Sequence, residues 1–220
     1  LGPVFFQFYG QAECPMTVSV LRPHEHDVDR PDRLASCGRP VPWLDVALLD
    51  DAGAPVTPGD PGEICVRGPL VMQEYHHQPE LTAEALRGGW LHTGDVARTD
   101  DEGYLTIVDR KKDIIVSGGF NVYPREVEDV LSAHPAVAAV AVIGVPDPQW
   151  GEAVKAVVVR RPGTAVGGDE LIALVRDRKG RVNAPKSVDF VDEIPLSPLG
   201  KPDKKALRAP YWPSGGRQVN

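Results

Sequence analysis

The sequence contains few cysteines, and their spacing does not suggest that any two form a pair. Cys14, Cys37 and Cys65 are odd in number and widely spaced, and no C-x-x-C motif occurs. This pattern argues against a disulfide framework of the kind that staples small secreted domains, and against a zinc site built on cysteines. We expect free thiols in a cytoplasmic protein.

Histidines with metal-ligand spacing are also missing. His24 and His26 form an H-x-H pair, and His76 and His77 are adjacent, but no further ligands accompany either pair. Zinc sites in proteins draw four ligands from characteristic spacings. We therefore expect loop histidines and not a metal centre.

Long apolar runs and a surplus of positive charge are absent as well. The longest apolar run, "AVAAVAVIGV" (136–145), falls short of the roughly 18–20 residues of a membrane-spanning helix. A formal net charge of −7 and a pI near 5.4 argue against a nucleic-acid or anionic-membrane surface. The beginning, "LGPVFFQFYGQ", has no basic region and no small-residue cleavage site, so we expect no signal peptide there. It also lacks an initiator Met and starts in the middle of an apolar strand pattern, so we expect a fragment.

What is present indicates a folded globular protein. Hydrophobic residues make up 42% of the 220 residues and charged residues 25%, which is enough for a real core. Glycine and proline, 22 of each, are spread along the chain as punctuation between elements. The length allows one large domain or two modest ones.

The first half of the chain predicts short strands and turns. "WLDVALLDDAGAPV" (43–56) predicts a hairpin that turns at Asp51, Ala52 and Gly53. The patterns predict two further strands and one helix: "GEICVRG" (62–68), "GYLTIVDR" (103–110), and the helix "PELTAEALRGGW" (79–90), ended by its two glycines.

The second half alternates helices and strands. "YPREVEDVLSAHP" (123–135) predicts a helix with Pro124 at its first position and an apolar face formed by Val127, Val130 and Leu131. Asp169 is the expected N-cap of a second helix. The remaining predicted elements are the strands at 136–145, 152–160 and 187–193 and that second helix at 168–179. A strand-rich half followed by an α+β half predicts two domains, with a boundary near Asp109 and Arg110.

Two loops of the first half carry carboxylates that packing does not explain. In "FYGQAE" (8–13), Glu13 follows an aromatic strand and a glycine turn, where a hard oxygen ligand suits Mg²⁺. In "WLHTGDVA" (90–97), Asp95 could accept hydrogen bonds from both hydroxyls of a ribose. Taken alone, a residue like Glu13 is more often a solvated loop residue, and a helix cap or a turn is the favoured interpretation of Asp95.

A third stretch, "IVDRKKDIIVSGGFNVYPREVE" (107–128), joins a charged run to a glycine-rich loop. Arg110 can donate to ribose or phosphate oxygens through its fixed fork of N–H groups. The backbone of "SGGFN" (117–121) can approach a ligand closely and leads into a helix N-terminus. For Lys111 and Lys112 we expect solvated surface charge.

The fourth stretch, "EIPLSPLGKPDKKALR" (193–208), places Lys201 on a loop that prolines keep out of a helix. A lysine is a point charge on a long stem and can reach a phosphate and a carboxylate together. Most lone lysines are surface residues, so the stretch gains meaning only from the other three.

Taken together and in this order, the stretches resemble the C-terminal half of adenylate-forming enzymes, and among them the acyl-CoA synthetases, or fatty-acid–CoA ligases. The resemblance covers Tyr9 to about Leu207. The matching segments are "YGQAE", "GEICVRG", "GWLHTGDVA", "GYLTIVDRKKDIIVSGGFNVYPREVEDVL", "HPAVAAVAVIGVPDPQWGEAVKAVVV" and "VDEIPLSPLGKPDKKALR".

The resemblance implies an α+β fold with a defined division of the chain. The end of a large, strand-rich ATP- and acyl-binding domain with a distorted β-barrel would occupy 1–108, and a hinge 109–110. A small mobile domain with a short sheet flanked by helices would occupy 111–208. A tail at 209–220, which we expect to be poorly ordered, would follow.

The family activates a carboxylic acid with ATP and Mg²⁺ to an acyl-adenylate, releases pyrophosphate, and transfers the acyl group to the thiol of CoA. By resemblance, Tyr9 packs on the adenine, Asp95 binds the ribose and Arg110 assists it. Glu13 matches the glutamate linked to Mg²⁺.

The remaining implied roles belong to the hinge and the mobile domain. Asp109 matches the hinge residue, about which the small domain swings between the two half-reactions. Lys201 matches the lysine that bridges the α-phosphate and the acyl carboxylate during adenylation. Gly119, in the glycine-rich loop, matches a position near the pantetheine tunnel of CoA.

The chain departs from the family pattern at three places. Ala12 stands where many members carry a phosphate-contacting threonine, and "RVNAPKSVDF" (181–190) lacks the usual tyrosine-lysine pair. The phosphate-binding loop, which lies upstream of "YGQAE" in the family, is missing. We therefore expect no ligase activity from the 220 residues alone.

Two other interpretations stay open at this point. The acyl acceptor could be a carrier-protein thiol, although "LHTGDVA", "RKKDIIVSGGFNVYPREVE" and "GVPDPQWGEAVKA" favour CoA, and these 220 residues contain no carrier domain after them. The chain could also be a non-catalytic remnant or interaction module. Against decay, Glu13, Asp95, Arg110 and Lys201 are all intact.

Overall fold

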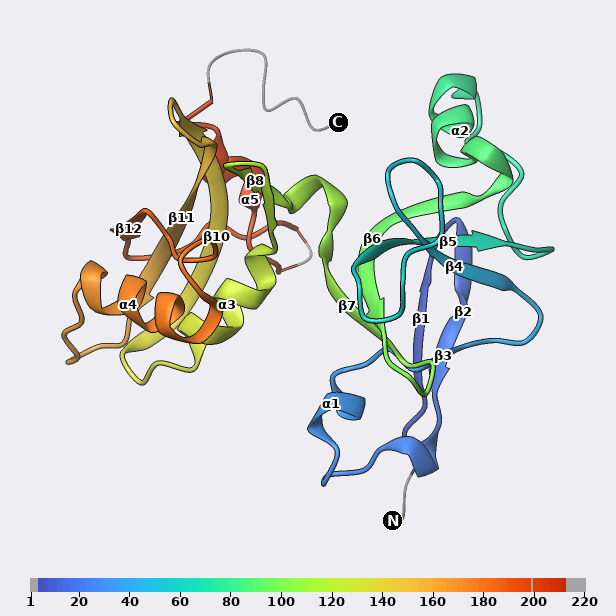
Figure 1. Cartoon of the computed structure of the whole chain (residues 1–220), viewed down its shortest axis with the longest axis horizontal. Helices are drawn as coiled ribbons and strands as arrows, with labels where there is room; N and C mark the ends of the chain where they lie inside the picture. The colour runs from blue at the N-terminus through green and yellow to red at the C-terminus, as the bar shows by residue number, and fades with distance from the viewer. Residues whose placement is uncertain (1–3, 199, 213–220) are drawn as a thin grey trace. The chain divides into compact units, whose positions relative to one another are not determined.

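The computed structural model describes residues 4–198 and 200–212, leaving aside the side chains of residues 16 and 17. The chain divides into two compact units, Leu1–Lys111 and Lys112–Asn220, each with its own hydrophobic core. Strands and helices occur in both units, so the predicted α+β class is confirmed (Figure 1). The hinge at 109–110 stays a prediction.

The first unit contains two antiparallel sheets. The three-stranded sheet has the order β1 (Gln7–Gln11), β2 (Cys14–Leu21), β3 (Arg39–Pro40). The four-stranded sheet has the order β4 (Asp45–Leu49), β5 (Gly62–Arg67), β6 (Leu91–Thr99), β7 (Leu105–Arg110). The short helical segments between strands are η1 (Pro23–Glu25), α1 (Pro31–Leu34), α2 (Pro79–Ala85) and η2 (Arg87–Gly89).

A shared core joins the two sheets of the first unit. Val18 and Val20 of β2 belong to the same buried cluster as Ile64 and Val66 of β5 and Leu91 of β6. In both β2 and β5 these residues are two apart, so they point to the same face of their strand. Apolar burial of this kind stabilises a fold by about 25 cal/mol per Å².

Most elements predicted for the first unit are confirmed. Strands β5 and β7 and helix α2 occur within the predicted ranges. The turn at Asp51–Gly53 is also present, with the Gly53 amide donating to the Asp50 carbonyl at 3.1 Å. Its returning arm, however, pairs with β4 only through one bridge, Leu49 to Pro55, and β4 takes β5 as its strand partner.

The second unit is a mixed sheet flanked by helices. Its long strands β10 (Val137–Asp147) and β11 (Gly151–Arg160) form an antiparallel pair, and β12 (Ser187–Phe190) lies parallel to β11. The β-hairpin β8 (Ile115–Ser117) and β9 (Phe120–Val122) joins β11 where Ser117 pairs with Gly151. The helices are η3 (Lys111–Asp113), which starts at the unit boundary, α3 (Pro124–Ser132), α4 (Gly168–Lys179) and α5 (Lys204–Arg208).

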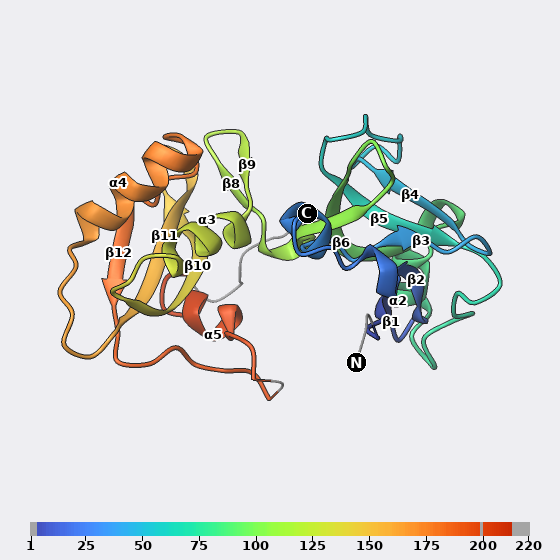
Figure 2. The ribbon, with the colours of Figure 1, turned by 90° about the horizontal axis from the view of Figure 1, so that it is seen from below.

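The long strands β10 and β11 carry buried residues on both faces. On β10, Val142 packs into the cluster that contains the apolar residues of α3 and α4, whereas Ala141 and Ile143 belong to a cluster that includes Ile194 and reaches Leu207 of α5. Alternation along the strand therefore separates the two helical layers, which is why the run at 136–145 carries apolar residues almost continuously. Figure 2 shows α3 and α4 beside the sheet.

Two expectations for the second unit need correction. The N-cap of α4 is Gly167, so Asp169 lies in the first turn, where its charge still suits the positive end of the helix. Of the tail expected at 209–220, residues 213–220 lie outside the described residues, but Tyr211 and Trp212 at its start are held in place. The Tyr211 hydroxyl donates to Asp189 at 2.6 Å and the Trp212 indole to the Gly144 carbonyl at 3.1 Å, because a tyrosine and a tryptophan each bring a donor to a largely apolar contact.

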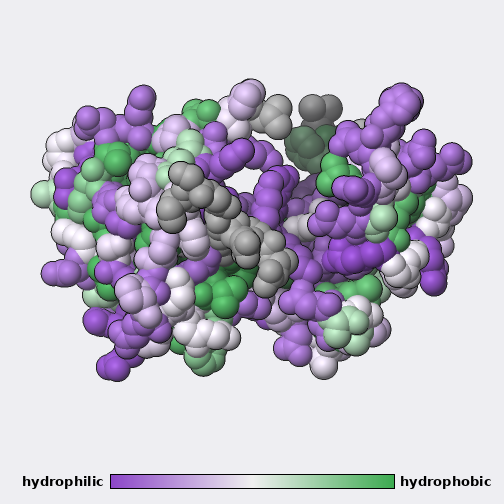
Figure 3. All heavy atoms as spheres, turned by 90° about the horizontal axis from the view of Figure 1, so that it is seen from above, coloured by the Kyte–Doolittle hydropathy of each residue, from purple (hydrophilic) through white to green (hydrophobic). Residues whose placement is uncertain are grey.

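The cysteines and the surface agree with the sequence. Among the described residues the three cysteines are buried and form no disulfide. Hydrophilic residues cover much of the face of each unit seen in Figure 3, with hydrophobic residues scattered between them. Of the helices in the described ranges, none is long and apolar enough to cross a membrane.

Candidate functional site

Strand β6 bulges where the T-G-D sequence occurs. Glu63 of β5 pairs with Val96 and Cys65 pairs with His92, so three residues of β6 (93–95) face the single residue Ile64. Gly94 adopts φ +72°, a conformation that side chains with a Cβ rarely take. A bulge re-aims the side chains beside it, here Asp95.

Side chains replace the ladder hydrogen bonds that the bulge interrupts. The Thr93 hydroxyl donates to the Ile64 carbonyl at 2.8 Å and accepts from the Asp95 amide at 3.2 Å. The Gly94 amide donates to Glu63 Oε1 at 3.1 Å. Because buried backbone groups need partners, these hydrogen bonds fix the conformation of the bulge (Thr93–Asp95), called the Thr93–Asp95 turn below.

The Asp95 carboxylate is nearly buried and is held by two donors from β1. Its residue is 8% exposed, and its Oδ2 accepts from the Tyr9 hydroxyl at 2.7 Å and from Gln11 Nε2 at 2.9 Å. Gln11 also donates to the Thr93 carbonyl at 2.8 Å. Burial, followed by the negative charge of Asp95, raises the pKa of Tyr9 well above its usual range, so the phenol stays a donor.

Arg110 completes this group from β7. It pairs with Asp95 across the β6–β7 register, and its Nε lies 3.5 Å from Asp95 Oδ1 with the side chain 57% exposed. A carboxylate has about four acceptor positions, and two of them on Oδ2 are filled. The Oδ1 side can therefore accept the hydroxyls of a ribose, with Arg110 beside it.

Glu13 lies in the two-residue turn between β1 and β2. Its Oε1 accepts from the Tyr75 hydroxyl at 2.6 Å, and its carbonyl accepts from the Met72 amide at 2.8 Å. The hydrogen bond to Glu13, followed by burial, raises the pKa of Tyr75 to about 12. A single oriented carboxylate fits Mg²⁺, which proteins often hold through one or two carboxylates together with substrate phosphates.

The other predicted site residues belong to the second unit. Gly119 forms the two-residue turn of the β8–β9 hairpin with Gly118, at φ +82° and +59°, the signs that tight hairpin turns require. Lys201 is exposed. The Ser197 amide donates to the Lys201 carbonyl at 2.7 Å, a hydrogen bond that closes the loop between these two residues. Among the described residues, no hydrogen bond or ion pair reaches Lys201 Nζ.

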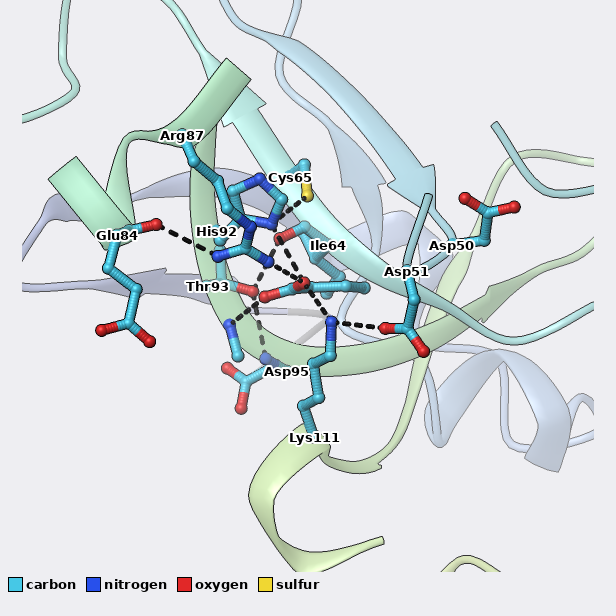
Figure 4. A network of polar contacts seen from close by, with 12 residues as sticks. Asp50, Asp51, Ile64, Cys65, Glu84, Arg87, His92, Thr93, Asp95 and Lys111 are labelled. Atoms are coloured by element: carbon cyan, nitrogen blue, oxygen red, sulfur yellow. Dashed lines mark hydrogen bonds and ion pairs between the residues drawn. The ribbon is translucent and has the colours of Figure 1, made fainter. Parts of the chain in front are cut away.

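Lys111 contradicts its expected role as a solvated charge. Its Nζ lies 2.7 Å from Asp51 Oδ1 and 3.1 Å from Glu63 Oε2, and its side chain is only 26% exposed (Figure 4). The physical reason is Glu63, whose side chain is 5% exposed and needs compensation of its charge. Arg87 and His92 approach the same Oε2 at 3.2 and 3.0 Å.

Glu63, Cys65 and His92 have ligand atoms within 4.8 Å of one another, and in the described part of the chain they are the group of three that could hold a metal ion. Two features oppose a divalent cation there. Lys111 and Arg87 already place positive charge on the Glu63 carboxylate. Burial and the Glu63 charge also raise the pKa of Cys65 to about 12, which disfavours the thiolate that binds metals.

The structure thus brings Tyr9, Asp95 and Arg110 together in the first unit and adds Gln11, which sequence reasoning missed. Gln11 lies within "YGQAE", two residues before Glu13, and its side chain donates to the same Asp95 oxygen as the Tyr9 hydroxyl. Its position next to two predicted site residues was the signal that could have found it. Glu63 and Lys111 are 48 residues apart, and neither "GEICVRG" nor "DRKKD" by itself predicts their contact.

Comparison with known proteins extends the argument to the whole chain. Residues 1–76 match the family described as AMP-binding enzyme, and residues 126–201 match the AMP-binding enzyme C-terminal domain. A medium/long-chain-fatty-acid–CoA ligase of Mycobacterium tuberculosis is 54% identical over 225 residues, covering 99% of this chain and 39% of the relative.

Two solved structures show the same fold. An amide bond synthetase from Marinactinospora thermotolerans is 45% identical, with a TM-score of 0.85, over 96% of this chain and 43% of that one. The o-succinylbenzoate CoA synthetase of Bacillus subtilis, in complex with ATP and magnesium ion, is 34% identical with a TM-score of 0.79 over 92% and 41%.

The chain spans about two-fifths of the length of these relatives. The two matched families follow each other in the order in which the two units occur, the end of an AMP-binding domain and then its C-terminal domain. The chain therefore belongs to the AMP-binding enzymes of the acyl-CoA ligase family, of which it covers the C-terminal part.

Proposed function

We propose that this chain is the C-terminal part of an enzyme that activates a carboxylic acid, a fatty acid in the first instance, with ATP and transfers it to CoA. The observation that carries the proposal is the nearly buried Asp95 carboxylate, held by Tyr9 and Gln11 and flanked by Arg110. The name of the 54% identical fatty-acid–CoA ligase supports the substrate class.

In the first half-reaction, an oxygen of the acid attacks the α-phosphorus of ATP, and the bond to pyrophosphate breaks. Asp95 and Arg110 would hold the ribose, Tyr9 would pack on the adenine, and Glu13 would hold Mg²⁺ at the phosphates. Lys201 would lie between the α-phosphate and the acid, where a preplaced cation stabilises the negative charge of the transition state.

In the second half-reaction, the thiol of CoA attacks the acyl carbonyl, its proton is released to solvent, and AMP leaves with the bonding electrons of the broken acyl–phosphate bond. Gly119, at the tip of the β8–β9 hairpin, would border the path of the thiol. The two half-reactions would use different residues of the second unit, Lys201 for the first and Gly119 for the second, with Asp109 as the hinge between them.

The test uses a joined enzyme, in which this chain replaces the matching C-terminal part of the Mycobacterium tuberculosis ligase. Lys201→Ala should lower adenylate formation, measured as pyrophosphate release, by about 10²-fold or more. The variant should still convert supplied acyl-adenylate with CoA. Gly119→Leu should do the reverse. Equal loss of both half-reactions in both variants would contradict the division of roles.

The isolated chain provides the matched control for this experiment. Without the upstream phosphate-binding loop, it should release no pyrophosphate from ATP and fatty acid above the background. Acyl-CoA formation by the isolated 220 residues would overturn that expectation.

The acceptor is tested in the same joined enzyme. CoA is the expected acceptor, and a carrier-protein thiol and an amine are the rivals, the latter because a 45% identical relative is an amide bond synthetase. Mass spectrometry of the products with each acceptor at equal concentration decides between them. Acyl transfer to the carrier protein or the amine in preference to CoA would refute CoA as the acceptor while leaving the adenylation step intact.

A further inference from the structure

Glu63 connects two segments that the proposed function treats separately. Its Oε1 accepts from the amide of Gly94, in the bulge that carries Asp95. Its Oε2 accepts from Lys111, which directly follows Arg110 and ends the first unit. The nearly buried carboxylate of Glu63 therefore joins the bulge that carries Asp95, the candidate ribose-binding residue, to Lys111, the residue that follows Arg110.

The hydrogen bonds of Glu63 to Gly94 and to Lys111 belong to the same buried carboxylate. With 5% of its side chain exposed, Glu63 has little access to water, and an ionised carboxylate in such a place requires cations and donors around it. Arg87 and His92 also contact Oε2, but the Arg87 side chain is 46% exposed and His92 is a histidine and not a fixed charge. Lys111, a fixed charge, is better shielded from solvent than Arg87.

From this arrangement we propose that Glu63 is a positioning residue that couples Lys111 to the conformation of the Thr93–Asp95 turn. While Lys111 is bound to Glu63, the carboxylate is fixed on the Gly94 amide and Asp95 keeps its orientation. When Lys111 is removed from Glu63, the hold on the turn weakens. The consequence for nucleotide binding rests on the proposed function, whereas the coupling itself does not.

The coupling is tested on the isolated chain by hydrogen exchange at the Gly94 amide. Glu63→Gln and Lys111→Met should each reduce the protection of this amide, by about tenfold, since a hydrogen bond to a charged group is lost or loosened. In the Glu63→Gln background, Lys111→Met should add less than about twofold, because the link between the two is already broken.

Arg30 offers a matched control for the loss of a cation. Like Lys111 it contacts two carboxylates of the first unit, Asp32 and Glu102, both at distances near 3 Å. Arg30→Met should leave the exchange of the Gly94 amide unchanged. Equal effects of Arg30→Met and Lys111→Met, or full additivity of the Glu63 and Lys111 substitutions, would overturn the coupling.

The joined enzyme shows whether the coupling acts on the nucleotide. Lys111→Met should raise the KM for ATP about tenfold with a smaller change in kcat, and Lys111→Arg should restore most of the affinity, since it keeps the charge. An unchanged KM in an active enzyme would contradict the role in nucleotide binding. If the unsubstituted joined enzyme forms no adenylate, the proposed function fails, and hydrogen exchange still decides the coupling.

Discussion

Asp95 and Glu63 lie on neighbouring strands, β6 and β5, and both are carboxylates with little access to solvent. Their surroundings differ. Asp95 is held mainly by the neutral donors Tyr9 and Gln11, so its Oδ1 side stays available. Glu63 is surrounded by Lys111, Arg87 and His92, and its charge is used within the protein. The surroundings of Asp95 suit a residue that binds a ligand, and those of Glu63 suit a residue that holds neighbouring segments together.

The hydroxyl of Tyr9 should stabilise the first unit measurably. We expect Tyr9→Phe to lower the free energy of unfolding by about 1.5–3 kcal/mol, because the nearly buried Asp95 loses a donor. Urea titration, read by hydrogen exchange of amides in each unit, measures the effect. Tyr211→Phe is the control: its partner Asp189 has 41% of its side chain exposed, so water replaces the donor and the loss should be about 0.5–1 kcal/mol. Equal losses would refute the argument.

The stability of the first unit should depend on pH through Glu63. Burial alone raises the pKa of Glu63, but hydrogen bonds from His92 and Lys111 and the charges of both outweigh it and lower the pKa below the ordinary 4.5. A lowered pKa in the folded state contributes stability that is present above pH 4.5 and is lost as the pH falls through the folded value.

The matching experiment compares the parent chain with Glu63→Gln across pH. The difference in unfolding free energy should be largest above pH 4.5 and should shrink as the pH falls below it, because a protonated glutamic acid resembles glutamine. Urea titrations at a series of pH values supply the data. A difference that grows toward acid would mean that Glu63 is not the ionised group described here.

At the residue scale, the resemblance predicted that Arg110 assists Asp95, and the structure places Arg110 Nε 3.5 Å from Asp95 Oδ1, whereas their role toward a ribose stays a prediction. Motifs carry this information because both residues sit in short, recognisable stretches. The Glu63–Lys111 contact joins strand β5 to the start of η3, just after β7, through tertiary packing, and "RKKD" by itself is compatible with full solvation. Such long-range ion pairs follow from burial, which a local pattern does not report.

Among the elements, the β8–β9 hairpin shows how two adjacent glycines differ. Both have positive φ, so alanine at either position is strained by about 1–2 kcal/mol. A Cβ at Gly118 would lie 2.7 Å from Cε3 of Trp150, whereas a Cβ at Gly119 would meet nothing within 4 Å. Gly119 therefore has room for a side chain and Gly118 does not.

We accordingly expect Gly118→Ala to destabilise the second unit more than Gly119→Ala does. Thermal unfolding followed by circular dichroism measures both variants against the parent chain. Trp150→Ala supplies the check, because removing the ring should bring the two alanine variants to similar stability. If Gly118→Ala stays the more costly after that change, the clash with Trp150 is not its cause.

Elements whose apolar residues repeat regularly were predicted from the sequence. A strand broken by a bulge and a helix cap without a side chain were not. Helix α3 and strands β10 and β11 follow from their apolar patterns, because their buried faces repeat at helical or strand spacing. Strand β6 was not recognised as one strand, since Gly94 breaks its alternation at the bulge. The cap of α4 was misplaced by two residues, because Gly167 lacks the side chain by which caps are recognised.

For the whole molecule, separate cores predict separate folding. The buried clusters of the second unit draw only on residues of that unit. We expect residues 112–220, expressed alone, to unfold cooperatively with the circular dichroism of an α+β protein. A gradual, non-cooperative transition in that polypeptide would show that it needs the first unit to fold.

The anchored residues Tyr211 and Trp212 have a practical consequence for anyone who produces this protein. A deletion that removes them takes away the hydrogen bonds to Asp189 and to the Gly144 carbonyl and uncovers Lys155, whose Nζ lies 5.0 Å from the centre of the Tyr211 ring. An affinity tag or a fluorescent label should therefore be attached after Trp212, where it leaves these contacts with β10, β11 and β12 undisturbed.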